Sequence, residues 1–219
     1  IGQTQLYYFS IDTAPPVGTL NQPIAGYNSS STTILFNCSV TDNVALRNVS
    51  LYGNWSGWSA KSTNSSGLNN TNYLFNLTLP EGDFVWNCLA CDNTNCSFAA
   101  SNRSITVDTT IPTLTVQLPP GGKAYNTTII PLNYTVLDAH LANCWFYNES
   151  INTTLINCAN TTFNQTAEGN HYIIVYSNDT AGNMASVRVN YSVDLIKPAI
   201  TVQSPIIGTI YNQTNILDL

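Results

Sequence analysis

Short runs in which apolar and polar residues alternate make up most of this chain. The clearest are Thr33–Val40 and Thr128–Val136, where every second residue is apolar or aromatic. Asn, Gly and Pro interrupt the pattern about every ten residues, and helix signals are poor throughout. A period of two, broken regularly by turn residues, predicts an all-β protein built as a sandwich.

A junction with the order Asp-to-Pro occurs three times, each time between two alternating runs. The copies lie at Ile11–Pro16, Val107–Pro112 and Val193–Pro198. Their Asp residues are about ninety residues apart, a spacing typical of small tandem domains. We therefore expect four segments: a terminal strand in residues 1–11, one domain in 12–108, a second in 109–194, and the opening strands of a further unit in 195–219.

The expected strands follow the same plan in both domains. A polar stretch at Ser56–Asn72 predicts a long exposed loop, and Thr154–Phe163 predicts a hairpin. The chain begins at Ile1 and stops inside an expected strand, so we expect a processed protein or a section of a longer one. The other expected strands are Gln5–Ile11, Thr33–Val40, Arg47–Asn54, Tyr73–Leu79, Phe84–Ala90, Arg103–Val107, Thr128–Val136, Cys144–Tyr147, His171–Ser177, Ser186–Val193, Ala199–Gln203 and Ile210–Leu219.

Aligning the two domains suggests how the six cysteines pair. Glu81-Gly82 falls on Glu168-Gly169, and in this register Cys88 matches Val175, while Cys38 matches Tyr134. A Cys pair replaced by an apolar–aromatic pair is expected of two residues that face each other across a core. Six cysteines allow 15 pairings. The two-domain division favours Cys38–Cys88, Cys91–Cys96 and, by elimination, Cys144–Cys158.

Composition excludes several classes of function. Only 8% of the residues are charged, the net charge is -6, and Lys and Arg number six. So few cations cannot neutralise many phosphates, and we expect no nucleic-acid partner. No apolar run approaches the ~18–20 residues of a membrane span, so none is expected in this section.

N-glycosylation triplets are strongly enriched. About 18 of roughly 29 Asn residues begin an N-x-[ST] sequon, where random placement would give roughly six. Together with the cysteines, this excess predicts a secreted glycoprotein with N-linked glycans on its surface. The sequons begin at Asn28, Asn37, Asn48, Asn54, Asn64, Asn69, Asn76, Asn95, Asn102, Asn126, Asn133, Asn148, Asn152, Asn160, Asn164, Asn178, Asn190 and Asn212.

Several motifs carry a resemblance to a known family. They are Glu168–Ile173 leading to Asn178–Asn183, then Val193-Asp194 with a following Pro198. These resemble the tandem immunoglobulin-like (Ig-like) repeats of prokaryotic cell-surface proteins. The Cys-rich version at Trp86–Asn93 and the sequon density are similar to archaeal examples. The resemblance implies two Ig-like β-sandwich domains, with a partial strand unit at each end, and a role as stalk, adhesin or filament subunit.

Candidate catalytic and metal-binding residues are few. His140 and His171 lack nearby partners, and Cys88-x-x-Cys91 lacks the second pair of a zinc site. Calcium between domains is a further alternative, with Asp12, Asp108 and Asp194 at the junctions and Asp42 and Asp138 in turns. Because each junction brings only one acid, we expect no metal or other cofactor and no enzyme activity.

The four tryptophans raise the alternative of carbohydrate binding. Trp86 shares a face with Cys88 and is expected in the core. Trp55 and Trp58 flank a loop beside the Asn54 sequon, where they could meet a glycan.

Strand alternation gives the functional expectation. If Cys38 and Val175 face inward, the sequon asparagines of the strands face outward, so glycans would block contacts along the sides and leave the ends free. Unpaired edge strands at the ends would pair with another chain. We therefore expect an extracellular or cell-surface structural protein that assembles end to end with copies of itself or with adjacent repeats. The alternative is an adhesin or glycan-binding module.

Overall fold

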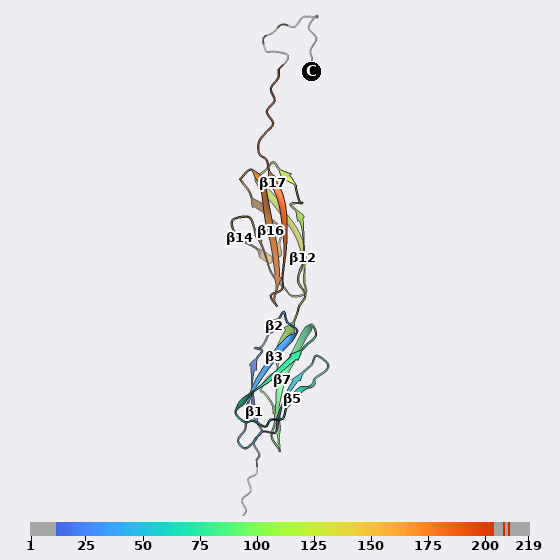
Figure 1. Ribbon diagram of the computed structural model, residues 1–219, viewed down its shortest axis with the longest axis vertical. Coiled ribbons are helices and arrows are strands. Elements are labelled where there is room, and N and C mark those ends of the chain that lie inside the picture. Colours follow the sequence, from blue (N-terminus) through green and yellow to red (C-terminus); the bar gives the residue numbers. More distant parts are fainter. Residues whose placement is uncertain (1–11, 204–207, 209, 211–219) are drawn as a thin grey trace, which may run out of the picture.

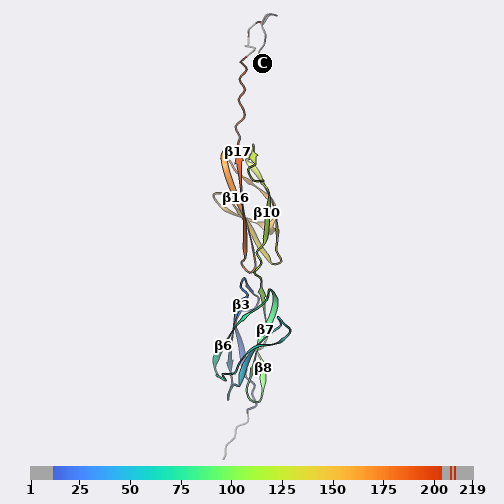
Figure 2. The ribbon, with the colours of Figure 1, turned by 45° about the vertical axis from the view of Figure 1, so that its right-hand side comes forward.

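The computed structural model describes residues 12–203, 208 and 210, and it contains two β-sandwiches placed end to end along one axis (Figure 1). Each hydrogen-bonded sheet of the described residues takes its strands from one sandwich only. The turned view in Figure 2 shows the same end-to-end arrangement, with one chain crossing between the two bodies. The all-β sandwich fold predicted from the alternation is confirmed.

The first sandwich packs a three-stranded sheet, in the order β1-β3-β6, against a larger sheet, in the order β2-β9-β7-β4-β5, with β8 paired to β7. Its strands are β1 (Val17–Gln22), β2 (Tyr27–Ser29), β3 (Thr33–Thr41), β4 (Asn48–Gly53), β5 (Ser59–Asn64), β6 (Thr71–Thr78), β7 (Gly82–Cys91), β8 (Cys96–Phe98) and β9 (Arg103–Val107).

The second sandwich repeats this plan, with sheets in the orders β10-β12-β15 and β11-β17-β16-β13-β14. Its elements are β10 (Thr113–Leu118), β11 (Ala124–Tyr125), β12 (Ile129–Leu137), β13 (Leu141–Tyr147), β14 (Asn152–Leu155), the 3₁₀ turn η1 (Ile156–Cys158), β15 (Thr161–Asn164), β16 (Gly169–Asp179) and β17 (Met184–Val193).

The two sandwiches share details of register as well as strand order. In each, the first strand pairs antiparallel with one sheet, and the short strand after it pairs parallel with the last strand of the other sheet. The first pairing places Leu20 opposite Cys38 in one sandwich and Val116 opposite Tyr134 in the other, and both ladders shift register directly afterwards. The positional match of Cys38 with Tyr134 is therefore confirmed.

Each sandwich has its own core, formed by the inward residues of the alternating runs. In the first, Phe36 lies against Trp86, with ring centroids 5.0 Å apart, and both side chains are fully buried. In the second, Ile130, Leu132 and Val175 are fully buried. Alternation places the intervening polar residues on the outer faces.

All three disulfides predicted from the sequence are present: Cys38–Cys88, Cys91–Cys96 and Cys144–Cys158. The first joins the two sheets of its sandwich. The second closes the turn between β7 and β8. The third ties η1 to β13, and the described residues contain no free cysteine.

Two local predictions were wrong. The stretch Ser56–Asn72 is not one long loop, because Ser59–Asn64 forms β5 at the edge of the sheet, paired with β4. Its residues are polar since both of its faces are largely open to solvent. The stretch Thr154–Phe163 is not a hairpin either: β14 pairs with β13 and β15 pairs with β12, so this segment crosses from one sheet to the other.

The outer ends differ from the sequence expectation or lie outside the described residues. Residues 195–203 form no strand, so the expected strand Ala199–Gln203 is absent. A strand needs a neighbour to hydrogen-bond with, and alternation alone cannot supply one. Gln5–Ile11 lies outside the described residues, as does Ile210–Leu219 apart from Ile210. Within the part of the chain that the structure describes, no helix is long and apolar enough to cross a membrane.

Candidate functional site: the domain junction and the outer faces

Asp108 is the residue that joins the two sandwiches. It follows β9, and only 6% of it is exposed. Its backbone N–H donates to Ser29 O of the first sandwich at 2.9 Å. Its carbonyl oxygen accepts from Asn183 Nδ2 of the second at 2.7 Å, and its Oδ1 accepts from Thr110 N at 3.0 Å. One residue is thus bonded to both domains and also fixes the turn between them.

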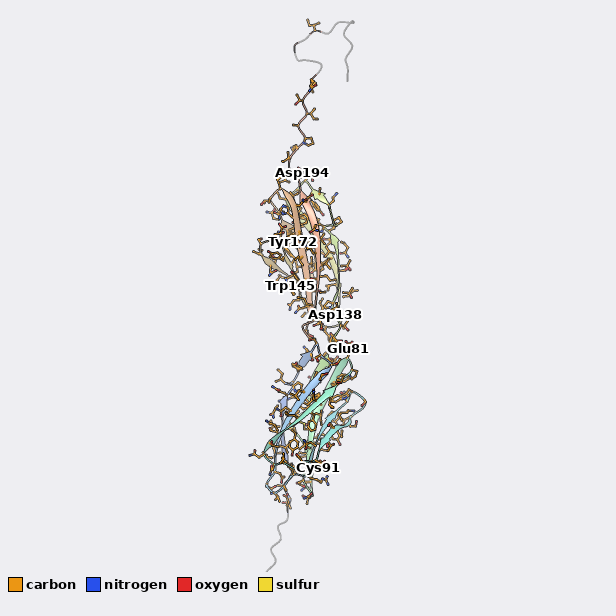
Figure 3. The ribbon with its side chains drawn as sticks, in the orientation of Figure 1. Glu81, Cys91, Asp138, Trp145, Tyr172 and Asp194 are labelled. Carbon is orange, nitrogen blue, oxygen red and sulfur yellow. A yellow bond between two sulfur atoms is a disulfide. The ribbon has the colours of Figure 1, made fainter. Side chains whose placement is uncertain are left out.

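Glu81 supports the same junction from the turn before β7. Its Oε1 accepts the backbone N–H of Thr109 at 3.1 Å and also the Thr109 hydroxyl. These hydrogen bonds, that of the hydroxyl first, lower the pKa of Glu81, so its carboxylate stays ionised at neutral pH. Figure 3 labels Glu81 and Asp138 on the two sides of the narrow connection between the sandwiches.

The same contacts recur after the second sandwich. The N–H of Asp194 donates to Tyr125 O at 2.9 Å, as that of Asp108 does to Ser29. Asp194 Oδ1 accepts from Ile196 N at 3.1 Å, and Glu168 Oε1 accepts from Leu195 N at 2.9 Å. The repeated sequence motif is therefore a repeated structure, in which a Glu and an Asp fix the first residues after each sandwich.

His140 enters the junction from the second sandwich. Its ring Nδ1–H donates to Asp108 Oδ2 at 2.7 Å, and its backbone N–H donates to Asp138 Oδ1 at 2.7 Å. The hydrogen bond to Asp108 raises the pKa of His140 above the ordinary value of 6.5. Nothing in the sequence indicates that His140 has a partner, because Asp108 lies 32 residues away in the chain.

A shallow hollow of about 220 Å³ opens beside these residues. It is lined by Glu81, Asp108 and His140 together with the apolar side chains of Ile111 and Leu137. Ile111 and Leu137 are 61% and 73% exposed. The two sandwiches therefore meet through a few specific polar bonds rather than through a large apolar interface.

The sequon asparagines lie on the outside of both sandwiches. None of the 17 that the structure describes is buried, whereas Asn87, which is not in a sequon, is only 2% exposed. At Asn54 and Asn160 the side-chain Oδ1 accepts a backbone N–H, from Val85 at 2.8 Å and Tyr134 at 2.9 Å. These bonds orient the side chain without using Nδ2, the atom that carries an N-linked glycan. Asn212 lies outside the described residues.

The large sheet of the second sandwich carries an aromatic outer face. Trp145 on β13 stacks on Tyr176 of β16, with centroids 5.2 Å apart and planes 7° apart. Further along the same strands, Tyr147 lies 6.3 Å from Tyr172, and the guanidinium of Arg188 lies 3.8 Å from the Tyr172 ring. Trp145 and Tyr172 are labelled on this sheet in Figure 3.

The tryptophans of the first sandwich divide differently. Trp86 is in the core, as expected. Trp55 is half-buried, since it stacks on Phe36 at 5.7 Å and contacts Phe84. Trp58 is 44% exposed. Of the two loop tryptophans expected to meet a glycan, only Trp58 therefore exposes much of its ring to solvent.

His171 is tied to its own sandwich. Its Nδ1 lies 2.8 Å from Glu149 Oε2, and its Nε2–H donates to Ala167 O at 2.9 Å. Both ring nitrogens are engaged in fixing the loops around β16, which is a structural arrangement.

Comparison with known proteins gives the fold. No family model and no curated protein matches the chain. Among solved structures, it is similar to the fibronectin(III)-like modules of Clostridium thermocellum CbhA, with a TM-score of 0.52 and 16% identity over 85% of this chain and 100% of that chain. The fold is that of Ig-like and fibronectin type III modules.

Two other solved structures are less similar. The FN1–FN3 domains of chicken CNTN1 have a TM-score of 0.38 and 12% identity over 82% of this chain and 69% of that one. The Ig1–2 module of the Drosophila receptor protein tyrosine phosphatase DLAR has a TM-score of 0.33 and 10% identity over 83% and 100%. At these values neither adds to the argument from CbhA. Disulfide bonds such as the three in this chain are typical of extracellular proteins.

Proposed function

We propose that this chain is a structural subunit, or a repeating section, of a heavily N-glycosylated extracellular filament, stalk or surface layer. It assembles end to end through its Ig-like domains, with copies of itself or with adjacent repeats as partners. The supporting observation is the repeated junction: the bonds by which Asp108 and Glu81 fix the first residues after one sandwich are made again by Asp194 and Glu168 after the next. Repeating one junction stacks successive domains in one manner, which is how like modules form an extended structure.

The exposed sequons support the same proposal from the side of the molecule. Glycans on these asparagines cover the flanks of both sandwiches and oppose lateral packing, so that contacts at the ends decide assembly. Strand pairing between neighbouring subunits is one way to join them end to end, since edge strands present unpaired N–H and C=O groups.

Electron microscopy of the protein from its native cells tests the assembly. We expect fibres or a surface layer with a regular repeat. Isolated monomers alone would refute the polymer. The intact mass under denaturing and reducing conditions then separates the two forms of the proposal, because a separate subunit has 23.8 kDa of protein plus glycans, whereas a repeat protein is much larger.

Glycopeptide mapping tests the sugar coat separately. Most sequons of both sandwiches should carry a glycan that glycosidase removes. Mostly unmodified asparagines would contradict the proposed protection of the flanks while leaving the end-to-end assembly to be judged by microscopy.

A glycan-binding adhesin is a second candidate, favoured by the aromatic outer face of the second sandwich. Tyr172, Arg188 and Asn190 line a hollow of about 390 Å³ there, and aromatic rings with an arginine are suited to stack on and bond to a sugar. The deglycosylated protein should then bind a glycan array, and Tyr172→Ala should abolish binding. Tyr27→Ala, at an exposed tyrosine of the first sandwich, is the control. Binding that survives Tyr172→Ala would exclude this hollow.

A further inference from the structure

Three carboxylates lie together in the first sandwich, and one of them, Asp92, directly follows Cys91, which Figure 3 labels near the outer end of that sandwich. Asp12 precedes β1, Asp42 follows β3, and Asp92 follows β7. Each offers a carboxylate oxygen that lies within 4.8 Å of those of the other two. Each junction brings only one acid in the sequence, but the fold places two further acids, distant in the chain, beside Asp12.

The local backbone fixes one side of Asp42 and Asp12. Asp42 Oδ2 accepts the N–H groups of Val44 at 2.8 Å and Ala45 at 3.0 Å. Asp12 Oδ1 accepts from Ala14 N at 3.3 Å, and Asp12 O accepts from the Thr94 hydroxyl at 3.3 Å. These turns hold the carboxylates together without neutralising their charge.

Asp92 is held most firmly. Its Oδ1 accepts the N–H groups of Asn95 at 2.6 Å and Thr94 at 2.5 Å. The bond from Asn95 is the main reason that the pKa of Asp92 is lowered, so the group is a carboxylate at neutral pH. The Cys91–Cys96 disulfide closes the loop that carries it.

The remaining oxygens of this cluster point to a ligand. Asp92 is only 2% exposed, and its Oδ2 is buried with no hydrogen-bond partner among the described residues. Asp42 Oδ1 is also buried, and the part of the chain that the structure describes offers it no hydrogen-bond partner. Burying ionised oxygens without a donor or a cation is strongly unfavourable.

No side chain of the described residues supplies the missing charge. The ion pairs among them are His140–Asp108 and His171–Glu149, neither of which involves this cluster. Arg47 lowers the pKa of Asp92 by its charge but forms no ion pair with it.

The second sandwich shows how the same arrangement is satisfied internally. Asp108, Asp138 and Asp179 occupy the equivalent positions. There His140 bonds to Asp108, and Asn183 donates to both oxygens of Asp179 at 2.9 and 2.6 Å. The equivalents of His140 and Asn183 in the first sandwich are Val44 and the disulfide-bonded Cys96, whose side chains have no hydrogen to donate to a carboxylate.

We propose that Asp12, Asp42 and Asp92 bind a calcium ion, which takes the place that His140 and Asn183 fill in the second sandwich. The donors are all oxygen, which favours a hard cation over zinc or copper, and all cysteines of the described residues are in disulfides. Calcium accepts irregular oxygen sites completed by carbonyls and water, whereas magnesium requires near-octahedral geometry. This site does not depend on the proposed filament.

Calorimetric titration of the oxidised 219-residue chain with CaCl₂, after treatment with EDTA, tests the proposal. We expect one calcium per chain with a dissociation constant on the order of 0.1–1 mM, as in extracellular modules. At 10 mM calcium, one of the two unfolding transitions should rise by about 5 °C or more, since the ion binds only the folded state. No heat up to 10 mM, or binding of magnesium but not of calcium, would overturn the proposal.

Matched variants locate the ion. Asp42→Asn should weaken binding at least about tenfold, whereas Asp138→Asn, at the equivalent position of the second sandwich, should leave it unchanged. Val44→His places an imidazole where the second sandwich has His140. Val44→His should abolish calcium binding at pH 6 while circular dichroism shows a folded chain. This second variant provides the test if Asp42→Asn does not fold. The proposed site would be wrong if Asp138→Asn lost calcium binding. It would also be wrong if Asp42→Asn and Val44→His both kept calcium binding.

Discussion

At the scale of single residues, the same residue type has opposite roles according to burial. Asn87 is inside the first sandwich: its Nδ2 donates to Ala99 O at 3.1 Å and to Asn102 Oδ1 at 2.8 Å, and its Oδ1 accepts from Cys88 N at 2.7 Å. Asn76 is exposed on β6 within a sequon. Asn87→Ala leaves buried groups unpaired and should lower the free energy of unfolding by about 2 kcal/mol.

Urea denaturation of the unglycosylated protein checks this difference. Asn76→Ala is the control and should change stability by less than about 0.5 kcal/mol. Equal effects of the two substitutions would mean that the buried hydrogen bonds of Asn87 contribute nothing net.

His140 gives the junction a dependence on pH. Because its hydrogen bond to Asp108 raises its pKa in the folded protein above 6.5, the folded state binds the proton more tightly than the unfolded chain does. The stabilisation is complete below about pH 6.5 and is lost as pH rises through the raised pKa. His140→Gln should remove this dependence on pH from Tm values measured between pH 5 and 9. If the Tm of His140→Gln varied with pH as that of the unaltered protein does, the His140–Asp108 bond would not be its cause.

At the scale of strands, the disulfides stabilise the two sandwiches to different degrees. Their cysteines are 50, 14 and 5 residues apart in Cys38–Cys88, Cys144–Cys158 and Cys91–Cys96. Restriction of the unfolded chain predicts contributions of about 4, 3 and 2 kcal/mol in that order. Paired Cys→Ala substitutions, measured by chemical denaturation, should reproduce this order. A larger loss for Cys91–Cys96 than for Cys38–Cys88 would reverse it.

The strands also show which structure alternation can predict. Runs with one buried face, such as β3 and β12, were predicted to within one residue at either end. Strand β5 was missed because both of its faces are largely open to solvent, so Ser59–Asn64 has no apolar side to reveal it. The crossing of β14 and β15 between sheets was missed because alternation predicts strands but not their partners.

The three-carboxylate cluster was not predictable for a related reason. Asp12, Asp42 and Asp92 lie in three turns separated by tens of residues, and only the sandwich brings the turns to one end. The sequence did contain part of the signal, since Asp12 and Asp108 stand in copies of one junction and Asp42 and Asp138 both stand in turns. What it lacked was the burial of the carboxylate oxygens, which decides whether an acid needs a partner.

At the scale of the whole molecule, the angle between the sandwiches depends on a few polar bonds at one narrow connection (Figure 2). Glu81 fixes the first residues after β9 by accepting from Thr109, so Glu81→Ala should free Thr109 and Thr110 and widen the distribution of interdomain angles. Small-angle scattering or residual dipolar couplings would detect the widening.

Glu168→Ala is the matched control, because Glu168 makes the equivalent bond to Leu195 after the second sandwich and not between the two. It should leave the interdomain distribution unchanged. Both variants should keep the cores intact, since Glu81 and Glu168 are exposed. If Glu81→Ala and Glu168→Ala gave the same scattering curve as the unaltered protein, the angle would have to be fixed by Asp108, His140 and Asn183 alone. If only Glu81→Ala broadens the distribution of interdomain angles, the glutamate that precedes β7, and its counterpart before β16, determine how straight a chain of these domains can be.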